Sequence, residues 1–257
     1  MSVKVNESLR KICAVIDAPI DVLTWDEAVS RISSMALTRA GHYVCICNVH
    51  SVVTARRSKD FSAVVKSADM ATADGAPVAW LMRRLGVLGQ ERINGPDLMW
   101  KYCQEAAGRG EPIFLYGGTQ STLDVLKERL HSIMPDLVIA GAYSPPFRAL
   151  SEEEDAAVVE AINASGARTV WVSLGCPKQE LWMAEHRDRI NAVMIGVGAA
   201  FDYHAGVIKR APVWMRNYGL EWLHRLCSEP QRLFKRYFVT NSLFMYYAAL
   251  QLLKSRR

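Results

Sequence analysis

Asp74 is the residue of this 257-residue chain whose position first suggests chemistry. It follows the apolar run Met70–Ala73 and precedes Gly75 and a predicted helix that starts near Pro77. A carboxylate at the end of a strand would face the crevice where parallel sheets bind ligands, and it could take a proton from a substrate hydroxyl as a general base. Asp also caps helix N-termini well, so a structural role is the alternative. The two roles are compatible, and both stay open for Asp74.

Arg92 and Asn94 form a second polar group, in the run Glu91-Arg92-Ile93-Asn94-Gly95-Pro96-Asp97. Asn94 is interpreted most simply as the N-cap of the helix that follows, and a contact with substrate is a second interpretation. Arg92 has no structural duty that the sequence reveals. We therefore expect Arg92 to contact substrate.

Two glycine-bearing loops could hold a phosphate, but neither matches a dinucleotide-binding fingerprint. Gly117-Gly118-Thr119 offers backbone N–H groups and a helix N-terminus to an anion. It is not a GxGxxG motif, the run Gly196–Phe201 lacks the third glycine, and no acidic residue stands where a ribose hydroxyl would be bound. A dinucleotide-dependent oxidoreductase is poorly supported, and we expect no cofactor.

Metal ligation is also weakly indicated. The six histidines are dispersed, and no HxxxH, HExxH or DxD arrangement occurs. The acidic run Glu152–Asp155 opens a predicted helix, where negative charge suits the helix dipole. We therefore expect chemistry without a metal ion.

The elements that must position these residues follow an alternating pattern. Short apolar runs alternate with helical patterns, which predicts βαβ units and a Rossmann-like parallel sheet flanked by helices. Ligands bind beyond the carboxyl ends of such strands, and the polar and glycine-bearing segments do lie there, which favours one shared crevice. The predicted strands are Tyr43–Asn48, Met70–Ala73, Pro112–Tyr116, Leu137–Ala142, Thr169–Leu174 and Ala192–Val197.

Several helix starts are also readable. Thr24 with Glu27, and Ser151 with Glu154, fit the capping box, in which side chain and backbone satisfy each other's hydrogen bonds. Residues 1–22 are predicted to form a small β-rich lead-in. Three prolines each fit the first position of a helix, namely Pro77, Pro96 and Pro177.

The last fifty-one residues, 207–257, differ in charge from the rest. They hold ten Lys/Arg, two Asp/Glu and nine aromatic residues, a net charge of +8; since the whole chain is +5, residues 1–206 carry −3. Such a segment suits a phosphate-rich or lipid–water boundary, and a merely solvated basic face is the alternative. We expect two helices here, and the second is predicted to carry one apolar face of Leu233, Phe234, Tyr237 and Phe238.

Composition fits an α/β catalytic core of residues 1–206 and a helical appendage of residues 207–257. Six scattered cysteines without a CxxC pair indicate reduced thiols in the cytosol, and the N-terminus lacks the apolar segment of a signal peptide. The longest uncharged stretch, Tyr237–Leu253, is shorter than the about twenty residues of a spanning helix. We expect it to be interfacial or packed.

Ordered motifs along the chain resemble the WecG/TagA/CpsF family, which is glycosyltransferase family twenty-six. The resemblance runs from about Val44 to about Tyr237 and lies in the following runs: Thr72-Ala73-Asp74-Gly75-Ala76-Pro77, Arg92-Ile93-Asn94-Gly95-Pro96-Asp97, Phe114-Leu115-Tyr116-Gly117-Gly118, Leu174-Gly175-Cys176-Pro177-Lys178-Gln179-Glu180, Gly196-Val197-Gly198-Ala199-Ala200-Phe201-Asp202, Arg210-Ala211-Pro212 and Gly219-Leu220-Glu221-Trp222-Leu223-His224-Arg225.

The resemblance implies a hexosyl- or N-acetylmannosaminyltransferase that moves a sugar from a UDP-sugar to a polyprenyl-diphosphate-linked sugar, with inversion and without a metal. Asp74 matches the family's proposed base and Arg92 a residue important for activity. A cytoplasmic protein, peripheral on the inner face of the cell membrane, is implied, with the tail meeting the membrane and supplying arginines. Arg232 is our choice for the departing diphosphate; the expected substrate contacts are Asn48, Asn94, Gly117, Gly118, Gln179, Asp202, Arg216, Arg225 and Arg236.

One segment departs from the family pattern. Members often carry Thr-x-Asn-x-Glu after the second strand, whereas this chain has Ile46-Cys47-Asn48-Val49-His50. The departure suggests a different sugar pair from that of the teichoic-acid members, and the wording of the tail is closer to members of exopolysaccharide biosynthesis.

Two other classes of protein remain as alternatives to the enzyme. One is a basic phosphate- or nucleic-acid-binding protein without catalysis, which the absence of any recognised nucleic-acid module disfavours, so we expect no nucleic-acid partner. The other is a regulator that senses a nucleotide sugar without turnover. The sequence leaves a homo-oligomer open.

Overall fold

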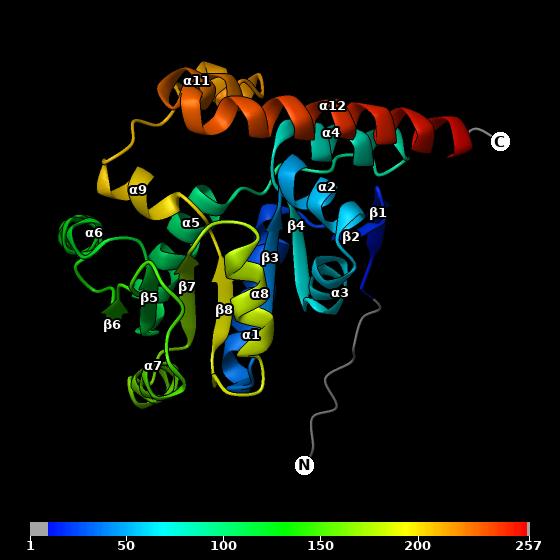
Figure 1. The fold of residues 1–257 in the computed structure, drawn as a ribbon. Helices are drawn as coiled ribbons and strands as arrows, with labels where there is room; N and C mark the ends of the chain where they lie inside the picture. Colours follow the sequence, from blue (N-terminus) through cyan, green and yellow to red (C-terminus); the bar gives the residue numbers. More distant parts are fainter. Residues whose placement is uncertain (1–9, 256–257) are drawn as a thin grey trace, which may run out of the picture.

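The computed structural model describes residues 10–255 and is built on a six-stranded parallel sheet of order β4-β3-β8-β7-β5-β6. A two-stranded antiparallel hairpin, β1–β2, precedes this sheet along the chain. In Figure 1, α11 and α12 lie across the upper edge of the molecule, above β3 and β4. The strands are β1 (Ile12–Val15), β2 (Ala18–Asp21), β3 (Tyr43–Cys47), β4 (Met70–Ala73), β5 (Ile113–Gly117), β6 (Ile139–Tyr143), β7 (Thr169–Ser173) and β8 (Val193–Gly196).

All six predicted strands of the parallel sheet are confirmed, with ends that differ by at most two residues. The hairpin confirms the β-rich lead-in for the described residues, while residues 1–9 lie outside them. The helices are α1 (Trp25–Thr38), α2 (Val49–Arg57), α3 (Lys59–Ser67), α4 (Ala76–Arg84), α5 (Gly95–Arg109), α6 (Gln120–Ile133), α7 (Glu152–Ala164), α8 (Lys178–Glu185), α9 (Ala200–Ala205), α10 (Val213–Asn217), α11 (Glu221–Ser228) and α12 (Pro230–Ser255).

The sheet is buried on both faces because successive residues of each strand enter different hydrophobic cores. In β3, Tyr43, Cys45 and Cys47 pack with α2, α3 and α8, whereas Val44 and Ile46 pack with α1 and α5. This alternation explains why the strands were readable as near-continuous apolar runs. Its consequence is that polar groups gather at the ends of the strands.

The helix starts agree with the sequence except at the prolines. Both predicted capping boxes form, at Thr24 with Glu27 and at Ser151 with Glu154. Pro77 and Pro96 are the second residues of α4 and α5, and Pro177 is the N-cap of α8, so the prediction of the first helical position was wrong by one residue. Each proline still lies where the helix needs no backbone N–H donor.

The first of the two helices predicted in the tail, expected to run through Trp214 and Leu220–Cys227, is in fact two helices, α10 and α11, which are separated at Gly219. Gly219 has φ +73°, and a Cβ there would lie 2.5 Å from the Cβ of Ala76. Glycine is required at this point for both its conformation and its closeness to α4. The tail is therefore packed against the residue two positions after Asp74.

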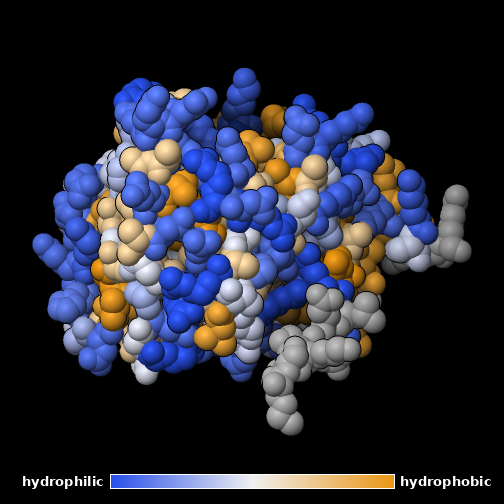
Figure 2. Space-filling view, turned by 90° about the horizontal axis from the view of Figure 1, so that it is seen from below, coloured by the Kyte–Doolittle hydropathy of each residue, from blue (hydrophilic) through white to orange (hydrophobic). Residues whose placement is uncertain are grey.

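The four residues of the predicted apolar face do not all lie on the same side of the long helix α12 relative to the core. Leu233 is buried, Tyr237 is half-buried, and Phe234 and Phe238 are 62% and 67% exposed. The prediction of a single face was wrong because the helix buries one stripe and leaves a neighbouring aromatic stripe outside. Figure 2 shows the opposite side of the molecule, seen from below, as mainly hydrophilic with small hydrophobic patches.

The far end of α12 returns to the hairpin at the start of the chain. Phe244 and Ala248 belong to the same core as β1, β2 and α2. The Gln251 side chain donates to the carbonyl of Ala14 (2.6 Å) and accepts from the N–H of Ile16 (2.9 Å), whose φ is +49°. Within residues 10–255, no helix is long and apolar enough to cross a membrane.

Candidate active site

Asp74 lies directly after β4, at the carboxyl edge of the sheet. Its N–H donates to the carbonyl of Cys47 at the end of the neighbouring β3 (2.9 Å). The N-cap of α4 is Gly75, which has φ +90°, so Asp74 is not the cap of that helix. Of the two roles that the sequence allowed, the structure leaves the carboxylate available for a ligand, with 20% of the side chain exposed.

Burial raises the pKa of Asp74 to about 6, because a carboxylate is poorly stabilised away from water. The nearby Glu221 carboxylate raises this pKa further, while Arg92 and Arg225 act against the shift. A base with a pKa near 6 is ionised at neutral pH and binds a proton more strongly than an ordinary Asp does. These are the properties that a general base needs.

Arg92 is held beside Asp74 by a backbone contact between two segments. The N–H of Ile93 donates to the carbonyl of Ala73 (2.9 Å), and the Thr72 hydroxyl donates to the carbonyl of Ile93 (3.1 Å). The segment that carries Arg92 therefore runs along the end of β4. The Nε atom of Arg92 lies 3.8 Å from the Asp74 carboxylate.

Glu221, the first residue of α11, joins two arginines. Its carboxylate forms an ion pair with Arg92 and another, at 3.3 Å, with Arg210. Arg210 also makes a two-pronged ion pair with Asp97 (2.5 and 2.8 Å). This chain of charges ties α11 to the beginning of α5. The sequence named both motifs that contain Glu221 and Arg210, but nothing in their spacing showed that the two side chains meet.

The structure confirms Asn94 as the N-cap of α5. Its amide oxygen accepts from the N–H of Asp97 (3.0 Å) and from Arg210 (3.2 Å), and its amide nitrogen donates to the Asp97 carboxylate (2.7 Å). The side chain is buried, and these three contacts use both acceptor positions of the amide oxygen and one of its two N–H donors. Asn94 thus helps to fix the positions of Asp97 and Arg210.

Four arginines near this edge have a buried Nε–H group that finds no hydrogen-bond partner among the described residues. They are Arg92 from the core and Arg216, Arg225 and Arg236 from α10, α11 and α12. Unused buried donors are uncommon in folded proteins and invite a ligand explanation. Arg216 and Arg225 lie near Arg92 and Asp74, since Arg92 donates to the carbonyl of Arg216 (3.5 Å) and the charge of Arg225 acts on Asp74. The charge of Arg236 acts instead on His50 and Cys176, which follow β3 and β7.

Arg232 is placed differently from the other tail arginines. Its side chain is 63% exposed and forms an ion pair with Glu229, one turn before it in the sequence. Asp202, at the start of α9, is half-buried, and burial raises its pKa, while the charges of Arg225 and Arg232 oppose this rise. Arg232 therefore lies within electrostatic range of Asp202, but at the surface.

Gln179 connects two loops. Its amide oxygen accepts from the N–H of Gly175 after β7 (3.2 Å) and from the N–H of Gly198 after β8 (3.0 Å). Its amide nitrogen donates to the buried carboxyl of Glu180 (3.0 Å). Burial raises the pKa of Glu180 to about 7, a feature that the sequence did not reveal. Gln179 shapes the crevice by holding its loops.

The other predicted contacts also have structural duties. Asn48 is the N-cap of α2 and accepts from the N–H of Ser51 (3.1 Å). A Cβ at Gly117 would lie 2.5 Å from the carbonyl oxygen of Ser173, and the N–H of Gly118 already donates to that oxygen (3.2 Å). These glycines allow the turn after β5 to approach β7 closely. They border the crevice without offering a free phosphate cradle at Gly118.

No cluster of three or more metal-ligating side chains occurs within residues 10–255. The candidate site combines the half-buried Asp74 carboxylate, several arginines, some of which are paired with Glu221, and two loops held by Gln179. A protein-family model described as "Glycosyl transferase WecG/TagA/CpsF family" matches residues 13–257, nearly the whole chain.

Proposed function

From the family to which this chain belongs, the WecG/TagA/CpsF glycosyltransferases, we propose a specific reaction: transfer of a sugar from a UDP-sugar to a polyprenyl-diphosphate-linked sugar, with inversion and without a metal ion. Membership of the family makes the protein a glycosyltransferase of cell-surface polysaccharide synthesis. The observation that carries the finer proposal is the Asp74 carboxylate, with its pKa near 6, beside arginines of both the core and the tail.

In the proposed reaction, a hydroxyl group of the acceptor sugar attacks the anomeric carbon of the donor. Asp74 takes the proton of that hydroxyl, and the bond between the anomeric carbon and the diphosphate oxygen breaks. The electron pair of this bond leaves with UDP. Because attack comes from the side opposite to the leaving group, the configuration at the anomeric carbon is inverted.

The departing diphosphate requires positive charge at the moment when the bond breaks. Arg92, Arg216, Arg225 and Arg236 each hold a buried Nε–H that makes no hydrogen bond with any residue of 10–255. Charge-assisted hydrogen bonds from arginine to phosphate are among the stronger polar contacts in proteins. We assign the diphosphate to this group of arginines, with Arg232 at the exposed rim.

The membrane part of the proposal rests on the outer surface of the tail. Phe234, Phe238, Met245 and Tyr246 of α12 are each more than half exposed, and Lys235 is exposed between them in the sequence. Aromatic rings and cations together favour the lipid–water boundary. We place the enzyme on the cytoplasmic face of the cell membrane, where a polyprenyl-linked acceptor would be presented.

The experiment that tests the function is incubation with a panel of UDP-sugars and short-chain lipid-diphosphate sugars, followed by mass spectrometry, with and without excess EDTA. We expect one productive pair, with equal rates in both conditions. Loss of the rate in EDTA that Mg²⁺ or Mn²⁺ restores would contradict the metal-free step. Binding of UDP without any turnover across the panel would instead identify a sensor of nucleotide sugars.

A further inference from the structure

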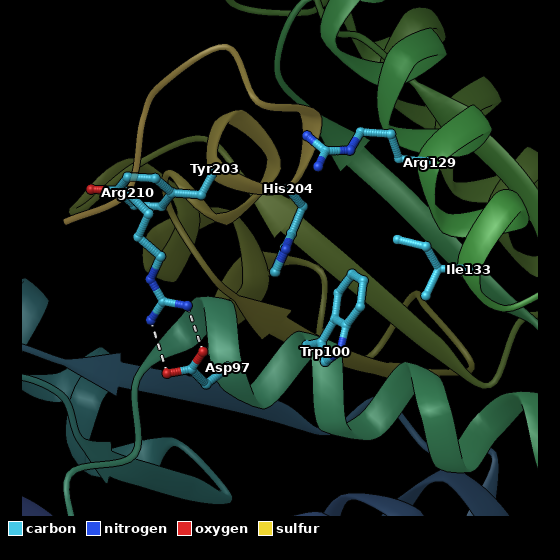
Figure 3. A pocket seen from close by; sticks show the side chains of 7 residues that line it. All are labelled: Asp97, Trp100, Arg129, Ile133, Tyr203, His204 and Arg210. Carbon is cyan, nitrogen blue, oxygen red and sulfur yellow. Dashed lines mark hydrogen bonds and ion pairs between the residues drawn. The ribbon is translucent and has the colours of Figure 1, made fainter. Parts of the chain in front are cut away.

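A cavity of about 280 Å³ lies on the side of α9 that bears Tyr203 and His204, between α5, α6 and α9. Figure 3 shows its lining, which includes Asp97 and Trp100 of α5, Arg129 and Ile133 of α6, and His204 with Arg210. The volume is at the lower limit of the roughly 300–1,000 Å³ of small-molecule sites. A single ring fits such a space better than a whole nucleotide sugar does. Asp74 does not line it.

One wall of the cavity is aromatic. The rings of Trp100 and His204 are stacked, with centroids 5.2 Å apart and an angle of 25° between their planes. Ile133, 53% exposed, adds an aliphatic side chain at the rim. Flat apolar rings of this kind pack well against the C–H face of a pyranose, because both surfaces lose contact with water.

The polar groups of the cavity offer both donors and acceptors. The Nε2 atom of His204 lies 2.8 Å from the carbonyl of Pro96, and burial lowers the pKa of His204. The neutral ring therefore donates through Nε2, which leaves Nδ1 as an acceptor. Arg129 supplies donors, since its side chain makes no ion pair or hydrogen bond with any residue of 10–255. Hydroxyl groups need this mixture of donors and acceptors.

The balance of charge disfavours a phosphate in this cavity. The two-pronged ion pair between Asp97 and Arg210 neutralises both of these groups. Arg129 is then the one cation of the lining that lacks a partner among the described residues, and a single arginine supplies less positive charge than a phosphate dianion carries negative charge. A neutral polyhydroxylated ring needs no such charge balance.

The cavity is also connected to the candidate active site by ion pairs. Arg210 faces the cavity and contacts Glu221, which contacts Arg92 beside Asp74. We propose that the cavity binds a hexopyranose ring that is not the reacting sugar. Either a further sugar of the lipid-linked chain or a free monosaccharide would supply that ring. Only the origin of the ring rests on the proposed function, because the binding itself follows from the lining.

The test is saturation-transfer NMR with free glucose, N-acetylglucosamine and N-acetylmannosamine, in the presence of excess UDP to occupy the donor site. We expect at least one of these sugars to receive saturation. Arg129→Ala and Ile133→Trp should each weaken this binding at least fivefold, the first by removing donors and the second by filling the rim. Lys127→Ala on the same helix, α6, is the matched control and should bind as the parent does.

The possible outcomes either overturn the proposal or identify the source of the sugar ring. No saturation of any sugar, or equal binding by the parent and Ile133→Trp, would overturn it, and so would displacement of the sugar by inorganic phosphate. A soluble diphosphate carrying two sugars distinguishes the sources. If it competes with the free monosaccharide in the parent protein, the ring belongs to the lipid-linked chain. If it does not compete, the cavity serves a free sugar. Failure of turnover would leave these binding results unchanged.

Discussion

At the scale of single residues, Asp74 owes its chemistry to its surroundings. An ordinary Asp is too weak a base to hold a proton near neutral pH, with a pKa of about 3.9. Burial at the end of β4 and the nearby Glu221 raise this value to about 6, although Arg92 opposes the change. The carboxylate therefore stays ionised under cellular conditions while becoming a stronger proton acceptor.

The raised pKa of Asp74 predicts the pH dependence of the reaction. The base works only when ionised, so kcat/KM should rise with pH, reach half of its plateau near pH 6 and stay level above pH 7. The measurement is a pH–rate profile between pH 4.5 and 8.5 with a soluble acceptor. A midpoint near pH 4 would mean that burial does not act on the reacting carboxylate.

Replacement of Asp74 by Asn tests its role directly. The amide keeps the shape of the side chain but accepts no proton, so we expect turnover to fall by roughly 10²–10⁴-fold while UDP-sugar binding is retained. Turnover is measured by mass spectrometry and binding by calorimetry. Asp124→Asn, at an exposed position of α6, is the control. Turnover of Asp74→Asn within threefold of the parent would remove Asp74 as the base.

Arg225 and Arg232 are expected to differ in their contribution to catalysis. Arg225 has a buried Nε–H that finds no hydrogen-bond partner in the described part of the chain, and its charge lowers the pKa of Asp74, whereas Arg232 is exposed and paired with Glu229. We predict that Arg225→Ala lowers kcat by roughly 10²–10³-fold and Arg232→Ala by less than tenfold. The comparison uses a soluble acceptor and a thermal melt of each variant. A larger effect at Arg232 would restore it as the principal contact of the diphosphate.

At the scale of elements, the loops after β7 and β8 depend on one side chain. Gln179 accepts from Gly175 and Gly198, so the two loops are held at a fixed separation where a donor would bind. The glycine turn after β5 is fixed in a related way, by its closeness to Ser173. The crevice is thus shaped mainly by contacts between loops.

Removal of the Gln179 side chain should loosen these loops. Gln179→Ala leaves two backbone N–H groups and the buried Glu180 carboxyl without their partner, and we expect the free energy of unfolding to fall by roughly 2–4 kcal/mol. The affinity for the UDP-sugar donor should also fall. Chemical denaturation measures the first effect and calorimetry the second. Gln120→Ala, at an exposed site of α6, is the control and should change neither the free energy of unfolding nor the affinity for the donor. If Gln179→Ala also left both quantities unchanged, the loops would be held by other contacts.

Prediction from sequence succeeded where local chemistry decides the structure. The six strands, both capping boxes and Asn94 as a cap follow from apolar periodicity and from hydrogen bonds a few residues apart. Prediction failed where the structure depends on contact with an element that is distant in sequence. The break at Gly219 depends on the approach of Ala76, and the exposure of Phe234 depends on which stripe of α12 meets the core.

The same distinction applies to the candidate site. Asp74 was proposed from the sequence because it directly follows a strand, and Arg92 because the sequence reveals no structural role for it. Glu221 was quoted only as part of a motif, since its role depends on two arginines that lie more than ten residues away from it. A sequence pattern carries no signal for an ion pair of this kind.

At the scale of the whole molecule, the tail is both a part of the fold and a surface. Its α12 helix buries Phe244 and Ala248 in the core that it shares with the hairpin, and it leaves Phe234 and Phe238 outside. A truncation at residue 205 would therefore remove core side chains together with the surface. The membrane role is better tested by substitutions at the exposed stripe alone.

The double variant Phe234→Ser/Phe238→Ser should bind anionic vesicles at least tenfold more weakly, because each phenylalanine buried in lipid contributes about 1.5–3 kcal/mol. Its turnover on a water-soluble acceptor should stay within twofold of the parent. Vesicle sedimentation and a soluble assay give the two readouts. Val125→Ser, exposed on α6, is the control. Unchanged vesicle binding of the double variant would exclude this stripe as the contact with lipid.

The hydrogen bond between the Gln251 side chain and the backbone of Ile16 has a consequence for the order in which parts of the protein fold. A β-branched residue with positive φ is rarely stable by itself, and here its N–H is satisfied by a side chain 235 residues further along. The turn of the β1–β2 hairpin therefore has its hydrogen bonds complete only once α12 has packed against it. Since contacts between residues so far apart in sequence form slowly, we expect this turn to become ordered late in folding.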